Sequence, residues 1–387
     1  MNDNTIRIRC VGDLILDVED NLSYFAKDTQ EAMRNCDLGI GQVEVAHTDR
    51  GTWSNPEASS APPSKPENLD ILPGLGINVA TLAGNHIFDQ GTYGVLDTMD
   101  YLDKLGIVNV GAGKNLEAAR KPAFKDVKGK KFAFLSYNTV GPSVSWATPL
   151  KAGCAFLKVS THYESDKAEP GGQPTNIYTI TDPACLSAME DDIKKAKAAA
   201  DYVIVAFHMG RMFSSKILTY QTEICHKAID AGASAILCCH AHQLLGTELY
   251  KDCPIYYGLG HFVVVSGVGV PDSWVRPQHS FRPFNDPSTV PYWPLPVGEY
   301  SPNRMYYIFN DESRMTMIAD MKIDEKGNIK SGFVPCYIVG DGIVETRNKD
   351  NGGEEIRAYM QRISDENNLG SEFVWNEDGS IILINAK

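Results

Sequence analysis

Short apolar runs alternate with helical patterns along the first two thirds of this chain, and this alternation restricts the fold more than any other feature. The apolar runs are typical of buried strands. They lie at residues 6–11, 77–82, 132–137, 202–207, 233–238 and 253–257. Helical patterns fall between them, at residues 22–35, 92–105, 186–200 and 217–231. Such alternation predicts an α/β sheet that is covered by helices on both faces.

Polar side chains follow four of these strands, at the sheet edge where open α/β sheets build their ligand sites. They are Asp13, Asn85, His86, His208, His240 and His242. Carboxylate, amide and imidazole groups together suit a divalent metal such as Mn, Fe or Zn. We expect one or two ions, with a metal-free site as the alternative. His240 and His242 can reach different ions only if the chain turns after its strand.

The last third of the chain has a different pattern. Residues 141–182 and 266–303 lack clear periodicity, and the second segment is rich in proline and aromatic residues, which favours an ordered lid or substrate wall. Residues 305–309, 315–323 and 329–339 predict a β-meander with a hairpin turn at Lys326-Gly327-Asn328. A helix near 354–367 and a strand at 381–385 follow. We divide the chain into a core at 1–265, a loop or lid at 266–304, and a meander and helix at 305–387 that complete the same domain.

Charge and composition narrow the class of partner. The 387 residues carry a formal net charge of −13, which argues against a nucleic-acid partner because phosphate binding needs a basic face. The first residues show no signal-peptide pattern, and no run approaches the ~18 apolar residues of a membrane helix. Nine scattered cysteines are typical of a reducing compartment. We expect a cytoplasmic protein with a small-molecule or peptide substrate, no nucleic acid and no membrane segment; the oligomeric state stays open.

Several motifs resemble those of the bacterial CapA family, which is named for poly-γ-glutamate capsule synthesis and is similar to calcineurin-like metallophosphatases. The resemblance extends over about residues 6–265. Glu44, in Gly41-Gln42-Val43-Glu44, occupies the place of an Asn-Leu-Glu segment, and residues 257–262 resemble a Tyr-Ser-Leu-Gly-Asn-Phe signature. The other matching motifs are Gly12-Asp13, Gly84-Asn85-His86 with Asp89 and Gly91, His208-Met209-Gly210, and His240-Ala241-His242 with Gln243.

The resemblance implies both a fold and a set of roles. The fold would be a four-layer α-β-β-α sandwich of the metallophosphatase-like type with a C-terminal β-rich extension. One metal would take Asp13, Glu44 and His242. The other would take Glu44, Asn85, His208 and His240. His86 would protonate the leaving group.

Three departures from the metallophosphatase pattern affect this expectation. Ile15 stands where Asp-x-His would place a histidine, and the bridging carboxylate is Glu44 instead of an aspartate, so the first metal site is expected to be weak or empty. His261 stands at the asparagine of the family signature, where it could be a catalytic acid or base, or could donate to a backbone carbonyl.

Arg211 could bind a substrate carboxylate or phosphate. His47 could line the pocket or lie at the surface.

Three functions remain open. The leading hypothesis is a metal-dependent hydrolase of a phosphoester or of an amide such as a γ-glutamyl or peptide bond, with His86 assisting the leaving group. The second is a metal-independent racemase or epimerase of an amino acid or peptide, in which Asp13, His86 and His261 exchange a proton. The third is an accessory protein of poly-γ-glutamate biosynthesis. The sequence does not identify the substrate.

Overall fold

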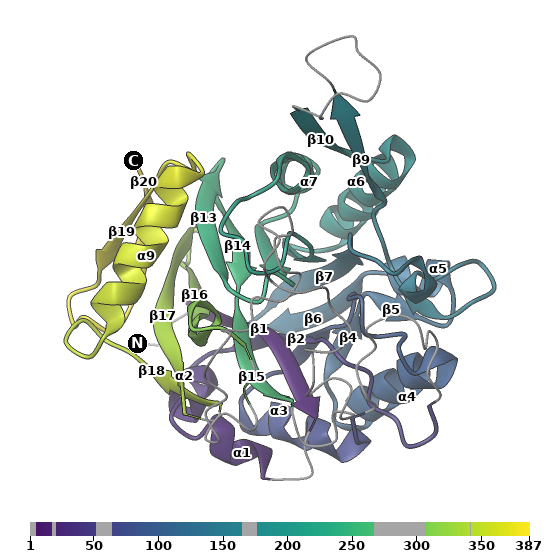
Figure 1. The fold of residues 1–387 in the computed structure, drawn as a ribbon, viewed down its shortest axis with the longest axis horizontal. Coiled ribbons are helices and arrows are strands. Elements are labelled where there is room, and N and C mark those ends of the chain that lie inside the picture. The colour runs from purple at the N-terminus through teal and green to yellow at the C-terminus, as the bar shows by residue number, and fades with distance from the viewer. Residues whose placement is uncertain are drawn as a thin grey trace, which may run out of the picture.

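Two β-sheets packed face to face form the centre of the molecule (Figure 1). The computed structural model describes residues 5–17, 21–51, 64–164, 176–266, 307, 309–340 and 342–387. The first sheet has the order β19(Ser371–Trp375)–β20(Ile382–Ala386)–β17(Ile329–Val339)–β16(Met315–Ile323)–β1(Ile6–Asp17)–β2(Leu38–Val43)–β3(Val79–Thr81)–β4(Val108–Val110), while β15(His261–Ser266) pairs with β1 and β18(Ile343–Thr346) pairs with β17. The second has the order β13(Leu244–Tyr250)–β14(Cys253–Leu259)–β12(Ala235–Cys239)–β11(Tyr202–His208)–β7(Lys130–Asn138)–β6(Ala123–Val127).

One hydrophobic core fills the space between the two sheets. Alternate residues of β1, such as Ile6 and Ile8, belong to the same buried cluster as alternate residues of β7, such as Phe132 and Phe134. Successive side chains of a strand point to opposite faces, so one strand can serve an inner and an outer core. Burial of each such side chain stabilises the fold by about 1.5–3 kcal/mol.

Helices cover the outer face of each sheet and complete a four-layer α-β-β-α sandwich, as the resemblance implies. Buried residues of α1(Leu22–Phe25), α3(Ile71–Gly74) and α4(Gly91–Lys104) pack in one cluster with Leu14 of β1. Buried residues of α6(Pro183–Ala199) and α7(Thr219–Asp230) pack in another with Val205 of β11. The amphipathic α9(Gly353–Glu366) contacts β13, β17 and β19. In the described ranges, no helix has the length and apolar character needed to cross a membrane.

Smaller elements occupy the connections. Helices α2(Gln30–Arg34) and α5(Leu116–Arg120) are short, as are the 3₁₀ turns η1(Pro66–Asp70), η2(Ser143–Ser145) and η3(Glu312–Arg314). The segment 141–182, which lacks periodicity, contains β8(Gly153–Cys154), β9(Val159–Glu164) and β10(Asn176–Thr181). β8 pairs with β5(Ala112–Gly113), and β9 pairs with β10.

Three sequence predictions differ from the observed elements. Residues 22–35 form α1 and α2 instead of one helix, because the Thr29 hydroxyl donates to the Ala26 carbonyl and ends the first helix. β2 was not predicted because glycines, which have low strand propensity, occupy positions 39 and 41. For the predicted strand 305–309, Tyr307 and Phe309 are described and lie outside any strand. The predicted lid, 266–304, falls outside the described residues apart from Ser266 at the end of β15.

The two sheets are linked at the point where β14 ends and β15 begins, with Gly260 alone between them. β15 runs parallel to the second half of β1, with Asp13 opposite His261. The Asp13 backbone N–H donates to the Gly260 carbonyl at 3.0 Å. A Cβ on Gly12 would lie 1.8 Å from that carbonyl oxygen, so this close crossing requires glycine.

We predict that Gly12→Ala lowers the free energy of unfolding by about 3 kcal/mol, because the backbone crossing must open to admit a methyl group. Gly74→Ala is the control, since its Cβ would meet only the end of the Arg34 side chain at 3.9 Å. The control should change stability by less than about 0.5 kcal/mol. Urea denaturation measures the free energy of unfolding of both variants. Equal stability of Gly12→Ala and the unaltered protein would contradict the account.

Candidate metal centre

The expected metal ligands come from five strands of the two sheets and meet in the seam between them. Four of them are less than 5% exposed: Asp13, Glu44, His208 and His242. Asp13 lies in an irregular stretch of β1, where the register with its neighbours shifts, and Glu44 directly follows β2. The others follow or end β3, β11 and β12; they are Asn85, His208, His240 and His242.

Asp13, Glu44 and His242 form one candidate ligand set. One ligand atom from each lies within 4.8 Å of the others, and all three residues are buried. His242 Nε2 lies 3.4 Å from Glu44 Oε1. Atoms bound to one ion at 2.0–2.2 Å stand roughly 3–3.5 Å apart, so this separation fits shared coordination.

Asn85, His208 and His240 form a second candidate ligand set near Glu44. His208 Nε2 lies 2.8 Å from Asn85 Oδ1 and 3.1 Å from His240 Nδ1. The same nitrogen lies 3.9 Å from Glu44 Oε1, so this oxygen is near one imidazole of each set. Because an amide oxygen and a second imidazole both lie close to His208 Nε2, these three residues are a candidate ligand set for a second ion.

The segment 240–242 turns sharply, which lets its two histidines serve different sets. His240 and His242 have positive φ angles of 90° and 57°, a region that residues other than glycine rarely adopt. Their rings are nearly perpendicular, with an interplanar angle of 89°. The His240 backbone N–H donates to Asp13 Oδ2 at 3.1 Å and holds the turn against β1. Backbone strain of this kind is concentrated at functional sites.

Several buried polar atoms of this cluster have no hydrogen-bond partner among the described residues: Asp13 Oδ1, both carboxylate oxygens of Glu44, and His208 Nδ1. A buried polar atom without a partner costs about 1–3 kcal/mol, and more when it is charged. One or two divalent ions would satisfy the carboxylate oxygens together. Carboxylate, imidazole and amide donors also fit Mn, Fe or Zn. The residues present therefore fit a metal centre.

The electrostatics of the cluster agree with this fit. Burial raises the pKa of Asp13 well above its ordinary value, and repulsion from Glu44 raises it further. Burial acts on Glu44 in the same direction, but attraction and hydrogen bonding to His242 outweigh it and hold the pKa of Glu44 below its ordinary range. Burial lowers the pKa of His208 to about 3 and that of His240 well below its ordinary value. Both imidazoles are therefore neutral at pH 7, the form that binds metal.

His86 differs from the other imidazoles because its side chain is 19% exposed and it has a carboxylate partner, Asp89, at 2.6 Å from Nδ1. Burial acts to lower the pKa of His86, but Asp89 and Glu44 outweigh it and raise the pKa to about 9. The ring is therefore protonated at neutral pH and can donate a proton.

His261 is fully buried, and both of its ring nitrogens have partners. Nε2 lies 2.8 Å from His242 Nδ1, and Nδ1 lies 3.0 Å from the hydroxyl of Tyr307. Phe309 packs against His261 with ring centroids 4.3 Å apart. Sequence reasoning assigned no role to Asp89, the partner of His86, or to Tyr307, the partner of His261. The spacing of His86 and Asp89 was a usable signal for Asp89.

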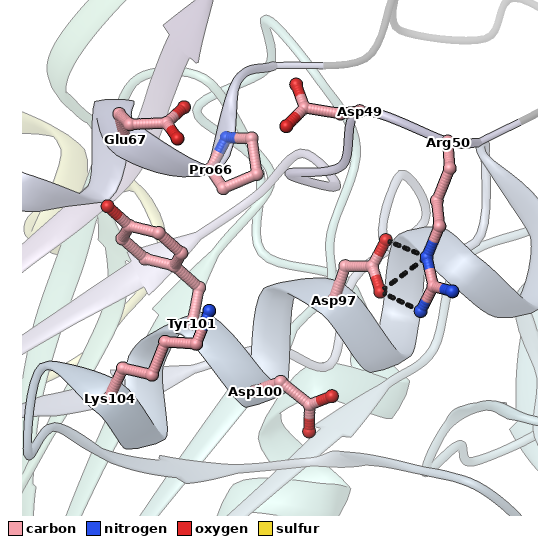
Figure 2. A pocket seen from close by; sticks show the side chains of 8 residues that line it. All are labelled: Asp49, Arg50, Pro66, Glu67, Asp97, Asp100, Tyr101 and Lys104. Carbon is pink, nitrogen blue, oxygen red and sulfur yellow. Dashed lines mark hydrogen bonds and ion pairs between the residues drawn. The ribbon is translucent and has the colours of Figure 1, made fainter.

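Arg211 is exposed, and within the described part of the chain no hydrogen bond or ion pair joins its side chain to the cluster. A separate groove of about 370 Å³ lies beside α4 and η1 and shares no lining residue with the cluster. Figure 2 shows the ion pair between Arg50 and Asp97 in this groove. Arg50 Nη2 lies 2.7 Å from Asp97 Oδ1. Its lining is mostly charged and includes Asp49, Arg50, Pro66, Glu67, Asp97, Asp100, Tyr101 and Lys104. The groove is therefore distinct from the candidate metal centre.

Comparison with known proteins gives one family and several relatives. The sequence profile of the family described as bacterial capsule synthesis protein PGA_cap matches residues 7–266. The capsule biosynthesis protein CapA of Bacillus anthracis is 25% identical over 319 residues, which is 79% of this chain and 71% of the relative. The PGA biosynthesis protein CapA of Bacillus subtilis is 27% identical over 248 residues, 64% of this chain and 57% of the relative. A probable polyglutamine synthesis accessory protein of Mycobacterium tuberculosis is 29% identical over 204 residues, 51% of this chain and 48% of the relative.

His47 leaves the centre three residues after Glu44 and is fully buried, not at the surface. Nδ1 lies 2.9 Å from the Lys65 carbonyl, to which it donates, and Nε2 has no partner among the described residues. Burial lowers the pKa of His47 to about 4, from an ordinary value of 6.5. Because the unfolded chain binds this proton more readily, His47 contributes stability above pH 6.5 that is lost as the pH falls towards 4.

We predict that His47→Asn, which keeps a donor for the Lys65 carbonyl, has a shallower pH dependence of stability than the unaltered protein. The difference should reach about 2 kcal/mol between pH 7 and pH 5, from 1.36 kcal/mol per pKa unit. Urea denaturation across this range measures it. Above pH 7 the two curves should run parallel. Parallel curves below pH 6.5 as well would contradict a buried neutral His47.

Proposed function

Because the chain belongs to the bacterial capsule synthesis protein PGA_cap family, we propose that it acts on poly-γ-glutamate or one of its precursors as a metal-dependent hydrolase. The bond cleaved is a γ-glutamyl amide or a phosphoester. The name of one relative, which refers to PGA biosynthesis, supports the choice of polymer.

The observation that carries the proposal is the set of buried donor atoms without hydrogen-bond partners around Glu44. Two carboxylates are completely buried, and three of their oxygens have no partner among the described residues. Such groups destabilise a hydrophobic core unless a cation compensates them, and a bound metal ion would do so. One imidazole of each set lies near the same oxygen of Glu44, His242 Nε2 at 3.4 Å and His208 Nε2 at 3.9 Å, which supports a bridging role for this carboxylate.

Asp13, Glu44 and His242 would hold one ion, and Glu44, Asn85, His208 and His240 would hold a second. Bound ions of this kind polarise an electrophile and lower the pKa of a water nucleophile. The chain's own contribution is a proton donor. His86 is the most exposed imidazole of the centre, and Asp89 keeps it protonated and oriented, so it can protonate a leaving group.

The structure gives less support to a metal-independent epimerase. Proton exchange at a substrate carbon needs an acid and a base that touch the substrate. Asp13 and His261 are both fully buried, and both nitrogens of His261 are already hydrogen-bonded. An accessory role is the second candidate, because the relative from Mycobacterium tuberculosis carries that description. Such a protein could bind metal and polymer without turnover.

Metal analysis and turnover together test the proposal. Protein purified without chelator should hold one to two equivalents of transition metal, and His240→Ala should lose at least one of them. His226→Ala is the matched control, because this half-buried histidine binds Glu248 away from the centre and should keep the full metal content. His86→Asn should also keep the metal but hydrolyse γ-glutamyl or phosphoester substrates about 10²–10⁴-fold more slowly.

The outcomes separate the candidates. Metal binding with turnover that depends on His86 supports the hydrolase. Metal binding without turnover on either substrate class, but with tight binding of poly-γ-glutamate, supports the accessory role. A protein that stays metal-free after reconstitution with Mn²⁺ or Zn²⁺ overturns the proposed centre.

A further inference from the structure

A line of hydrogen bonds leads away from the candidate metal centre through His242, His261 and Tyr307 to the backbone of Ser313. Its distances are 2.8 Å from His242 Nδ1 to His261 Nε2, 3.0 Å from His261 Nδ1 to the Tyr307 hydroxyl, and 2.7 Å from that hydroxyl to the Ser313 carbonyl. His242, His261, Tyr307 and Ser313 are all buried. The line therefore runs through a region that water does not enter freely.

The far end of the line fixes the direction of every bond in it. A backbone carbonyl only accepts, so the single proton of the Tyr307 hydroxyl points to Ser313. The Tyr307 oxygen must then accept from His261, which places the ring proton of His261 on Nδ1. A neutral imidazole carries one such proton, so His261 Nε2 is an acceptor.

The proton position on His242 follows from that on His261. Because His261 Nε2 accepts, the proton of His242 lies on Nδ1. When His242 is neutral, as a metal ligand must be, its other nitrogen, Nε2, then carries a lone pair. That atom faces Glu44 Oε1 at 3.4 Å, inside the ligand set with Asp13. The Ser313 carbonyl thus selects, through two side chains, which nitrogen of His242 can bind a metal.

The surroundings hold the line in place. The Thr316 hydroxyl donates to the His261 backbone carbonyl, and the Arg314 guanidinium lies 4.8 Å over the Tyr307 ring. Aromatic rings flank the imidazoles: Phe213 lies 5.7 Å from His242, and Phe309 lies 4.3 Å from His261. Packing against these rings restricts rotation of the imidazoles.

We propose that His261 is a positioning residue that fixes the tautomer of His242 and thereby makes Nε2 a metal ligand. This inference rests on the proposed metal centre. It assigns His261 a role through His242 instead of contact with substrate. His242 is the only imidazole in the set with Asp13 and Glu44, so the affinity of that set depends strongly on its orientation. Partners that orient a ligating histidine typically change metal affinity by about 10–100-fold.

Nitrogen NMR of ¹⁵N-histidine-labelled, metal-free protein tests the tautomers directly. We expect His242 and His261 both to carry their proton on Nδ1. His242→Gln and His261→Gln variants assign the two resonances. A His242 ring with its proton on Nε2 would overturn the proposal, whatever the activity of the protein.

Mn²⁺ titration of three variants tests the consequence. His261→Leu removes the acceptor for His242 Nδ1–H and should weaken Mn²⁺ binding by about 10–100-fold. His261→Gln supplies an amide oxygen as a substitute acceptor and should restore most of the affinity. Tyr307→Phe keeps both histidines but removes the hydroxyl that accepts from His261 Nδ1, so either nitrogen of His261 can carry the proton. Its Mn²⁺ affinity should fall between those of His261→Leu and His261→Gln.

The failures of the two proposals can be told apart. Unchanged Mn²⁺ affinity in His261→Leu, or equal losses in the Leu and Gln variants, would overturn the positioning role and leave the metal centre standing. A wild-type protein that binds no Mn²⁺ would overturn the metal centre and the positioning role together.

Discussion

Two buried carboxylates, Asp13 and Glu44, impose the main constraint on this structure. Both are completely removed from water where the two sheets meet, and three of their four oxygens have no hydrogen-bond partner in the described part of the chain. Isolated charges in such a place cost several kcal/mol each unless something compensates them. The surrounding imidazoles and the turn at His240 are suited to hold a cation that compensates these charges.

The sandwich brings these groups together because its two sheets approach closely at one seam. β1 carries Asp13, and the passage from β14 to β15 at Gly260 carries His261 to the opposite position. Glycine at position 12 lets the two backbones touch. From the second sheet, β11 and β12 deliver His208, His240 and His242 to the same seam. The fold therefore supplies the ligands from strands that are distant in sequence, with packed cores on both sides to keep them rigid.

The sequence predicted the four layers through the resemblance, and it predicted most of the cluster because residues at strand ends share a sheet edge. It failed where local signals conflict with tertiary contacts. β2 contains glycines that fit a close approach of Gly39 to the Gly76 backbone, so its composition does not look like a strand. Residues 22–35 have a helical pattern, yet the buried Thr29 interrupts it. Glu44 follows that unpredicted strand, and only the resemblance indicated it.

The role inferred for His261 was beyond sequence reasoning for a different reason. Its partners lie 19 and 46 residues away along the chain, and the direction of its hydrogen bonds depends on a backbone carbonyl at Ser313. A residue whose spacing suggests an acid or base can instead orient its neighbour, and only the three-dimensional contacts distinguish these roles. Three-dimensional contacts were also needed for His47. From the sequence it could line the pocket or lie at the surface, and the structure shows that it is buried.

Anomalous diffraction from crystals grown with Mn²⁺ tests the central claim most directly. The account predicts a peak within bonding distance of the Glu44 carboxylate, flanked by Asp13 and His242, and a second peak near Asn85, His208 and His240 if both ions bind. Crystals with Mn²⁺ bound only elsewhere, and with Glu44 oxygens that contact no ion, would contradict it.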